Sequence, residues 1–230
     1  MKQKVFIATP AYDGRVHTAF TASLIMSFSR MAHAGIQATW ESLDGCCYIP
    51  VARNKLVRSF LESDYTDMLF VDSDVGWDAD GLMRLLSYDR PFTAGIVPFK
   101  IDQEAYPVHF QMKEDGTPSI DEETGLTEGI MVATAFMRIR REVFELMIEK
   151  YPDALLVVEK NINGDKDGEY MNFFDCVRLG ERWWGEDARF CRLWTSIGGK
   201  IWIDPNIDFT HSGSKTWEGN FLKFLQKAPE

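Results

Sequence analysis

The chain has 230 residues and a formal net charge of −10, a length that suits one large domain with a single core. The acidic balance disfavours a protein that wraps nucleic acid through its phosphates, because such proteins carry a basic surplus. No apolar run reaches the roughly 18 residues that a membrane span needs. Residues 1–14 also lack the apolar stretch of a signal peptide.

The four cysteines show neither the spacing of a zinc site nor that of a disulfide framework. They are Cys46, Cys47, Cys176 and Cys191. We therefore expect reduced thiols that mostly pack in the core, as in a protein of a reducing compartment. The expected location is the cytoplasm of the producing or host cell.

The first hundred residues alternate predicted strands with predicted helices. Short apolar runs predict four strands, at 4–9, at 36–43, within 67–74 and at 91–100. Helical spacing of apolar residues, with terminal Gly and Pro signals, predicts helices at 16–35, 50–63 and 78–89. This order predicts a mostly parallel sheet with helices on both faces.

The second half is less regular. Residues 108–140 suggest a hairpin and a further strand, and 140–151 a helix. Residues 152–184 are expected to be irregular. A helix at 185–199, a strand at 200–205 and a final helix at 215–228 complete the prediction. The predicted fold class is therefore α/β, with a Rossmann-like central sheet and a mixed C-terminal half.

The segment "MLFVDSDVGW" places Asp72 and Asp74 directly after the third predicted strand. In open α/β sheets ligands bind beyond the carboxyl ends of the strands, where residues 9–13 and Lys100 are also expected. Asp78 can cap the following helix, which leaves the earlier pair without that structural role. Two nearby carboxylates repel each other, and a divalent metal relieves this. Mg²⁺ or Mn²⁺ prefers oxygen ligands and bridges phosphate oxygens. The pair therefore predicts a metal ion that carries a diphosphate.

Several segments resemble GT-A-fold glycosyltransferases, most closely the short single-domain bacterial and viral members. They occur in the order seen in that family: "IATPAYDG" (7–14), "PVARNKLV" (50–57), "FVDSDVGW" (70–77), "GEDARFC" (185–191) and "DFTHSG" (208–213). The resemblance covers nearly the whole chain and is weakest between about Asp102 and Leu179. "DSD" is similar to the DxD motif of the family.

The resemblance implies a donor site and a metal site. Asp74 and His211 would bind Mn²⁺ or Mg²⁺, and Asp72 would contact the metal or the ribose of the donor. The remaining donor-binding residues that it implies, with Lys100 added from its strand-end position, are Thr9, Pro10, Ala11, Tyr12, Arg53, Ser73 and Lys100. From the residues alone, His211 also suits a packed position, and Arg53 a charge on a helix surface.

The resemblance also implies an acceptor site. The acidic residue of "GEDARFC" would face the acceptor, which makes Asp187 and Glu186 the candidate catalytic residues. Both open a predicted helix, where acids also act as simple caps. Trp183 and Trp184 precede them and are candidates for stacking on an acceptor sugar, although two such residues also suit a core.

The predicted activity is metal-dependent transfer of a sugar from a UDP- or GDP-sugar to an acceptor hydroxyl. The acceptor is a glycan, a protein or a hydroxylated base of viral DNA. Residues 1–230 would form one domain, with 1–100 binding the nucleotide and 101–230 the acceptor. Asp187 would be the general base of an inverting enzyme, whereas a retaining enzyme needs no such base. Two alternatives are a sugar-phosphate nucleotidyltransferase, disfavoured by the lack of a glycine-rich basic loop after the first strand, and a non-catalytic nucleotide-sugar or glycan-binding module.

Overall fold

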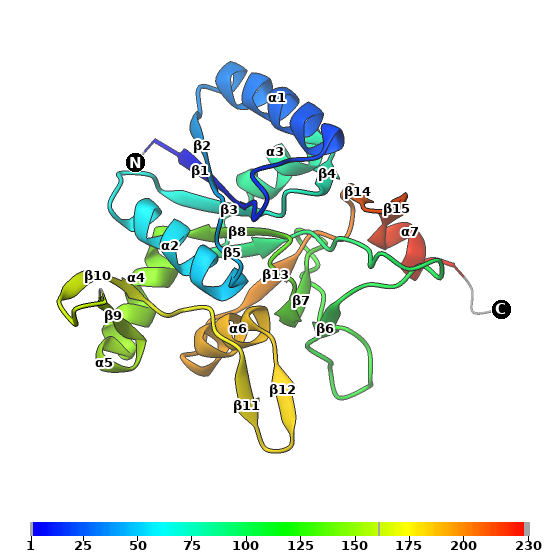
Figure 1. The fold of residues 1–230 in the computed structure, drawn as a ribbon. Coiled ribbons are helices and arrows are strands. Elements are labelled where there is room, and N and C mark those ends of the chain that lie inside the picture. Colours follow the sequence, from blue (N-terminus) through cyan, green and yellow to red (C-terminus); the bar gives the residue numbers. More distant parts are fainter. Residues whose placement is uncertain (1, 161, 228–230) are drawn as a thin grey trace.

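An eight-stranded sheet runs through the molecule in the order β2-β1-β3-β8-β5-β13-β7-β6 (Figure 1). The computed structural model describes residues 2–160 and 162–227. All strands of this sheet except β7 and β8 point the same way. The strands are β1 (Lys4–Pro10), β2 (Gln37–Leu43), β3 (Asp67–Val71), β5 (Phe92–Ala94), β6 (Val108–Phe110), β7 (Thr127–Val132), β8 (Phe136–Arg140) and β13 (Ile201–Ile203). The predicted α/β class with a mostly parallel central sheet is confirmed.

Helices cover both faces of the sheet (Figure 1). On one face lie α1 (Thr18–His33) and α3 (Ala79–Ser87), and on the other lie α2 (Ile49–Leu61), α4 (Arg141–Lys150) and α6 (Glu186–Ser196). The alternation of side chains along β1 explains this sandwich. Val5 and Ile7 pack in one apolar cluster with Phe20 of α1, whereas Phe6 packs in a second cluster with Phe144 of α4. A strand that is apolar on both sides needs cover on both sides.

The predicted helix signals act as expected. Gly35 follows α1 with φ 69°, a conformation that suits glycine at a helix end. Pro50 lies in the first turn of α2. Asp78 precedes α3, and its side chain accepts a hydrogen bond from the backbone N–H of Gly81. Asp78 is therefore the cap, as predicted.

A small antiparallel sheet of β4 (Val75–Trp77), β14 (Asp208–Ser212) and β15 (Thr216–Asn220) lies beside the main one. The predicted final helix is therefore wrong over 216–220, and only α7 (Phe221–Leu225) is helical there. Residue 228, where that prediction ended, lies outside the described residues. The predicted strand at 91–100 is also too long, because β5 ends at Ala94.

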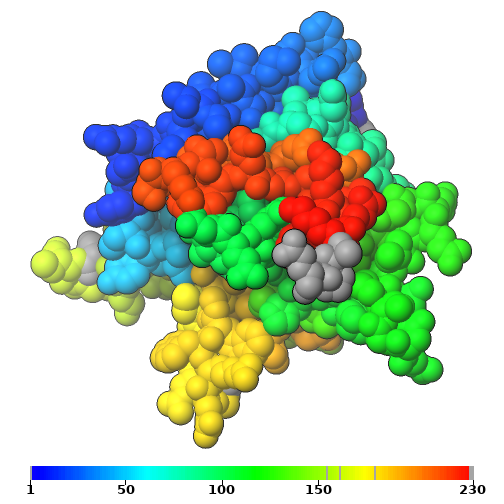
Figure 2. Space-filling model, turned by 90° about the vertical axis from the view of Figure 1, so that its right-hand side faces the viewer, coloured from blue at the N-terminus to red at the C-terminus, as the bar shows by residue number. Residues whose placement is uncertain are grey.

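Residues 152–184 are not irregular, contrary to the prediction. A short helix α5 (Pro152–Leu155) is followed by a hairpin of β9 (Leu156–Lys160) and β10 (Lys166–Met171) and a second hairpin of β11 (Val177–Leu179) and β12 (Arg182–Trp184). The second hairpin projects from the body of the molecule, in yellow in Figure 2. It leads directly into α6, so it lies next to the predicted acceptor residues.

The main sheet takes strands from both predicted halves of the chain, since β1, β2, β3 and β5 precede residue 100 and the others follow it. The assignment of nucleotide and acceptor binding to these halves stays a prediction. All four cysteines are free thiols, but Cys47 and Cys176 are exposed rather than packed. No helix in residues 2–160 and 162–227 has both the length and the apolar character to span a membrane.

Candidate active site

The "DSD" loop leaves the carboxyl end of a strand whose residues are all buried. Backbone bonds fix this loop: Asp72 donates its N–H to the Ala135 carbonyl at 3.3 Å, and Val75 donates to the Asp72 carbonyl at 3.1 Å. The segment after β1 lies against the same loop, because the His17 N–H donates to the Ser73 carbonyl at 2.9 Å. The ends of β1 and β3 therefore meet at one edge of the sheet, as the parallel arrangement predicted.

The small sheet brings Asp74 and His211 together. In the β4–β14 pairing His211 lies opposite Val75, and the Ser212 N–H donates to the Asp74 carbonyl at 2.8 Å. The imidazole Nε2 of His211 lies 3.5 Å from Asp74 Oδ1. Its Nδ1 lies 2.7 Å from the carbonyl oxygen of Pro98, which can only accept a hydrogen bond. With its proton on Nδ1, the ring keeps on Nε2 the lone pair that a metal ligand needs, whereas a proton on Nε2 is donated to Asp74.

Asp74 also receives the ammonium group of Lys100, which approaches its other oxygen. Burial by itself would raise the pKa of Asp74, but the hydrogen bonds from His211 and Lys100 outweigh it and hold the pKa at about 2. Asp74 is therefore a carboxylate throughout the neutral range. Lys100 therefore lies at this edge of the sheet, as expected from the sequence. It follows an irregular segment, however, and not a strand.

Arg53 connects the "DSD" loop to the start of α6. Its side chain is only 6% exposed, so it is not a charge on a helix surface. One terminal nitrogen lies 3.1 Å from Asp72 Oδ1, and the other pairs with Glu186 Oε1. Its Nε is buried without a hydrogen-bond partner among the described residues. Asp72 thus contacts Arg53 rather than His211, and Glu186 is held by a cation.

Asp187 lies beside this ion pair in the first turn of α6. Burial raises the pKa of Asp187 above its usual range, and the neighbouring charge of Glu186 raises it further. Asp187 accepts a hydrogen bond from the Ala188 N–H at 2.6 Å, while the capping position of the helix is occupied by Gly185. A half-buried carboxylate with a raised pKa is a stronger base than an exposed one, which suits proton abstraction.

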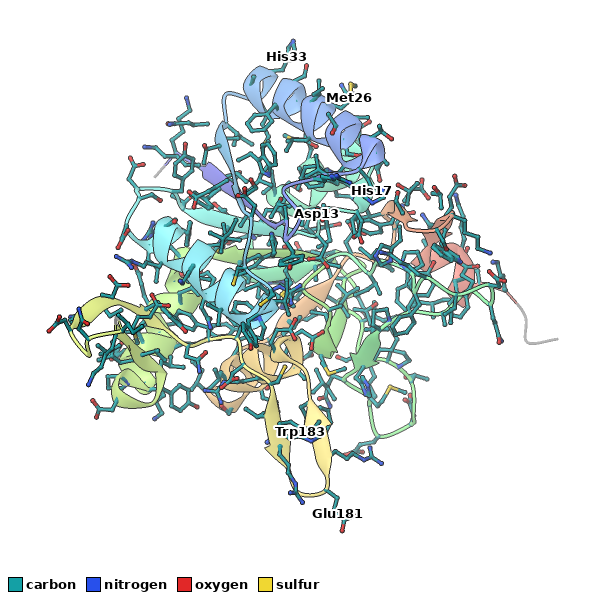
Figure 3. All side chains as sticks on the ribbon, viewed as in Figure 1. Asp13, His17, Met26, His33, Glu181 and Trp183 are labelled. Carbon is teal, nitrogen blue, oxygen red and sulfur yellow. The ribbon has the colours of Figure 1, made fainter. Side chains whose placement is uncertain are left out.

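The segment after β1 offers one exposed side chain among the predicted residues. Thr9, Pro10 and Ala11 are buried, and the Thr9 hydroxyl accepts a hydrogen bond from the indole N–H of Trp40 at 3.0 Å. The Tyr12 ring is 66% exposed. Asp13 and His17 follow it along the chain (Figure 3). Contact of these residues with a nucleotide stays a prediction, and Tyr12 is the best placed for it.

The two predicted aromatic residues lie on the projecting hairpin. Trp183 is 74% exposed, so it is not a core residue. Figure 3 shows Trp183 on the hairpin and Glu181 at its tip. Trp184 is half-buried and lies at the base, opposite Val177. An exposed indole on an arm that leads into the Asp187 helix is available to a ligand.

Two of the three predicted metal ligands are close to each other. Asp74 Oδ1 and His211 Nε2 lie 3.5 Å apart, whereas Asp72 faces Arg53. Within residues 2–160 and 162–227, no three His, Cys, Asp or Glu side chains gather in an arrangement that could hold a metal. The chemistry of Asp74 and His211 fits a divalent cation that takes its other ligands from a bound substrate or water.

Sequence reasoning missed the residues that hold these groups in place. The Pro98 carbonyl orients His211, and no sequence signal marks it. Asn54 follows Arg53 on α2 and bonds both the N–H and the carbonyl of Phe174, at 2.9 Å and 2.8 Å. These bonds fix the chain just before the projecting hairpin. A buried amide next to a buried arginine in "VARN" is the one available signal for this contact.

Comparisons with known proteins add little to this geometry. No protein-family model matches the chain, and no curated protein matches it. Among solved structures, the chain is similar to a glycosyltransferase involved in the glycosylation of the major capsid of PBCV-1, with a TM-score of 0.36 and 10% sequence identity. That similarity covers 65% of this chain and 67% of the other. A likeness this low says nothing of function.

Proposed function

We propose that this protein is a metal-dependent glycosyltransferase that uses a nucleoside-diphosphate sugar. One observation carries the proposal: Asp74 and the Nε2 of His211 lie 3.5 Å apart at the carboxyl edge of the sheet. A carboxylate and a neutral imidazole this close together are suitable ligands for Mn²⁺ or Mg²⁺. When bound there, the metal would supply positive charge that stabilises the departing diphosphate.

The residues around Asp74 suit the donor. Lys100 pairs with Asp74 in this structure and is exposed enough to turn toward a phosphate. The exposed ring of Tyr12, in the segment after β1, is available to a nucleotide base or ribose. Asp72 keeps one oxygen free of Arg53 and, at a side-chain exposure of 32%, can accept a hydrogen bond from a ribose hydroxyl.

The start of α6 suits the acceptor. Asp187 is the candidate general base, because its environment favours the protonated form and so strengthens its basicity. Glu186 is engaged by Arg53 and is therefore a positioning residue rather than the base. Trp183 offers a face on which a sugar ring or another planar group can stack. This division of roles belongs to an inverting enzyme.

The donor nucleotide is UDP or GDP, and the acceptor is a hydroxyl of a glycan, a protein or a modified viral DNA base. A hydrolysis screen tests the first half of this proposal without the acceptor. UDP- and GDP-sugars are incubated with the protein and Mn²⁺ or Mg²⁺, and released nucleotide is measured. Slow hydrolysis of one donor class that disappears with EDTA and in Asp74→Asn is the expected result. No hydrolysis of any donor, together with no metal-dependent binding of UDP or GDP, would contradict the proposal.

A further inference from the structure

A cavity lies along α6, and none of the predicted donor, metal or catalytic residues lines it. Its volume is about 500 Å³. It is lined by Arg189, Arg192, Leu193 and Thr195 of α6, by Ile130 of β7 and by Val177 of β11. The buried side of α6 is formed by other positions, Ala188, Phe190, Cys191 and Trp194. The arginines therefore belong to the outer side of the helix, at the spacing of neighbours on one face.

The two arginines have no acidic partner. Within residues 2–160 and 162–227, the guanidinium nitrogens of Arg189 and Arg192 form no hydrogen bond and no ion pair, and the Nε of Arg189 is buried. Arg84, Arg90 and Arg138, by contrast, each pair with an aspartate. The chain has 35 acidic and 25 basic residues, so carboxylates are plentiful. Two unpaired guanidinium groups in one cavity repel each other unless an anion lies between them.

The neighbouring hairpin extends this positive region. In the described part of the chain, Arg178 and Arg182 of β11 and β12 form no ion pair either, and the Nε of Arg178 donates only to the Gly180 carbonyl at 3.1 Å. The unpaired arginines thus gather around the hairpin and α6, although the chain as a whole is acidic. A positive region of this kind raises the local concentration of anionic ligands.

We propose that this cavity is a subsite for an oxyanion, a phosphate or a carboxylate, on the acceptor. Guanidinium groups bind both anions through paired N–H donors. Ile130, Val177 and Leu193 supply an apolar wall for the part of the ligand next to the anion. The role of this subsite rests on the proposed function, because the cavity lies along α6, the helix whose first turn carries Asp187. The acceptor would then be an anionic molecule that reaches from this cavity to the start of α6.

Two probes test the cavity: phenyl phosphate and benzoate, with benzyl alcohol as the neutral control. Binding is measured by calorimetry on the full chain. The double variant Arg189→Gln, Arg192→Gln should lose at least about tenfold in affinity, as expected when charge-assisted hydrogen bonds are removed. The matched control is Arg182→Gln, an unpaired arginine outside the cavity, which should change affinity by less than about twofold. Benzyl alcohol should not bind.

A second variant covers the case in which the double variant does not fold. Thr195→Glu leaves both arginines in place and adds a carboxylate to the cavity wall, so it should compete with either probe and weaken its binding. Tighter binding of phenyl phosphate would identify a phosphate acceptor, and tighter binding of benzoate a carboxylate. Absence of binding of both probes at millimolar concentration would overturn the proposal. Equal weakening in Arg182→Gln would also overturn it, because that result indicates diffuse charge rather than a site.

Titration of UDP and GDP with Mn²⁺ separates this inference from the proposed function. The probes should bind equally well with and without the nucleotide, since the two sites share no residue. If nucleotide binds and the probes do not, the anionic subsite alone is wrong. If the probes bind and no nucleotide does, the cavity remains an anion site, but its role in acceptor binding is wrong. Displacement of the probes by nucleotide would show that they occupy the donor site and would overturn the separate subsite.

Discussion

His211 presents its Nε2 to the carboxylate of Asp74 at 3.5 Å, while its other nitrogen is bound to the Pro98 carbonyl. If this pair binds a metal, His211→Ala should lower the affinity for Mn²⁺ in the presence of UDP or GDP. The expected loss is at least about tenfold, since even the loss of a group that only orients a ligand costs about 10–100-fold. Calorimetric titration measures it. His33→Ala is the control, because His33 is exposed on α1 (Figure 3) and should leave the affinity unchanged. Equal affinity of His211→Ala and wild type would show that His211 only packs.

Asp74→Asn should have the larger effect on the same measurement. The substitution keeps the size of the side chain but removes the charge that Lys100 and a metal would bind. We expect metal-dependent binding of UDP or GDP to be lost, with the circular dichroism spectrum of wild type. Asp102→Asn is the matched control, because Asp102 also pairs with a lysine, Lys215, but is exposed. Retention of metal-dependent binding in Asp74→Asn would show that the metal, if any, binds elsewhere.

Arg53 allows a prediction about stability. It is buried between Asp72 and Glu186, so Arg53→Met leaves two partly buried carboxylates without a partner. Breaking a buried ion pair in this way costs about 3 kcal/mol or more. Urea unfolding measures that loss. The control is Arg58→Met on the same helix, whose exposed pair with Glu62 is screened by water and should leave the midpoint nearly unchanged. Similar midpoints for the two variants would indicate that the Arg53 pairs contribute no stability.

The first half of the fold and the position of "DSD" could be predicted because the signals there are long and redundant. β1 and β3 are continuous apolar runs, and the helices between them have clear periodicity and end signals. The meeting of Asp74 and His211 could not be derived in the same way. It depends on pairing between β4, which has three residues, and β14, far along the chain. Strands this short leave no periodicity, so only the family resemblance linked the two residues.

The wrong predictions after residue 150 have two causes. The spacing of Trp217, Phe221 and Leu225 suits a helix as well as a strand followed by one, and the sheet partner β14 decides between them. In the two hairpins the sequence does carry a turn signal. Gly164 and Gly180 both have positive φ, and "NG" at 163–164 is a strong turn signal between two strand-like segments. The Arg189 and Arg192 cavity had no sequence signal, since pairing of charges depends on the folded chain.

Trp183 tests the acceptor surface. Because the indole is 74% exposed, Trp183→Ala should not lower the melting temperature. It should raise the KM for the acceptor and leave donor binding unchanged, with a loss of about 1 kcal/mol for one stacked ring. Leu156→Ala is a suitable control, since that side chain is 49% exposed on the other hairpin. An unchanged KM, measured with a real acceptor, would remove Trp183 from the acceptor site.

Measurements of stability and of rate together show whether Asp187 is a general base or a structural residue. Its pKa is raised by burial and by Glu186, so the fold favours the protonated form. Asp187 therefore stabilises the protein most at pH values below the ordinary pKa of an aspartate, and this contribution is lost as the pH rises through the raised value. Asp187→Asn has no carboxyl group to ionise at this position, so the variant does not lose this stability as the pH rises. At pH 7 its melting temperature should equal or exceed that of wild type, whereas a residue needed as a cap would lower it by the equivalent of about 0.5–2 kcal/mol.

The rate of sugar transfer by Asp187→Asn, unlike its melting temperature, should fall. Without its base, Asp187→Asn should transfer sugar about 10²–10⁴-fold more slowly, with near-normal donor binding. In wild type, kcat/KM should fall on the acid side at a pH above the ordinary pKa of an aspartate, because the raised pKa keeps the base protonated there. Glu186→Gln gives the contrast, since it leaves Arg53 short of a partner and should lower stability more than rate. Near-normal turnover of Asp187→Asn with a real acceptor would exclude Asp187 as the base and favour a retaining mechanism.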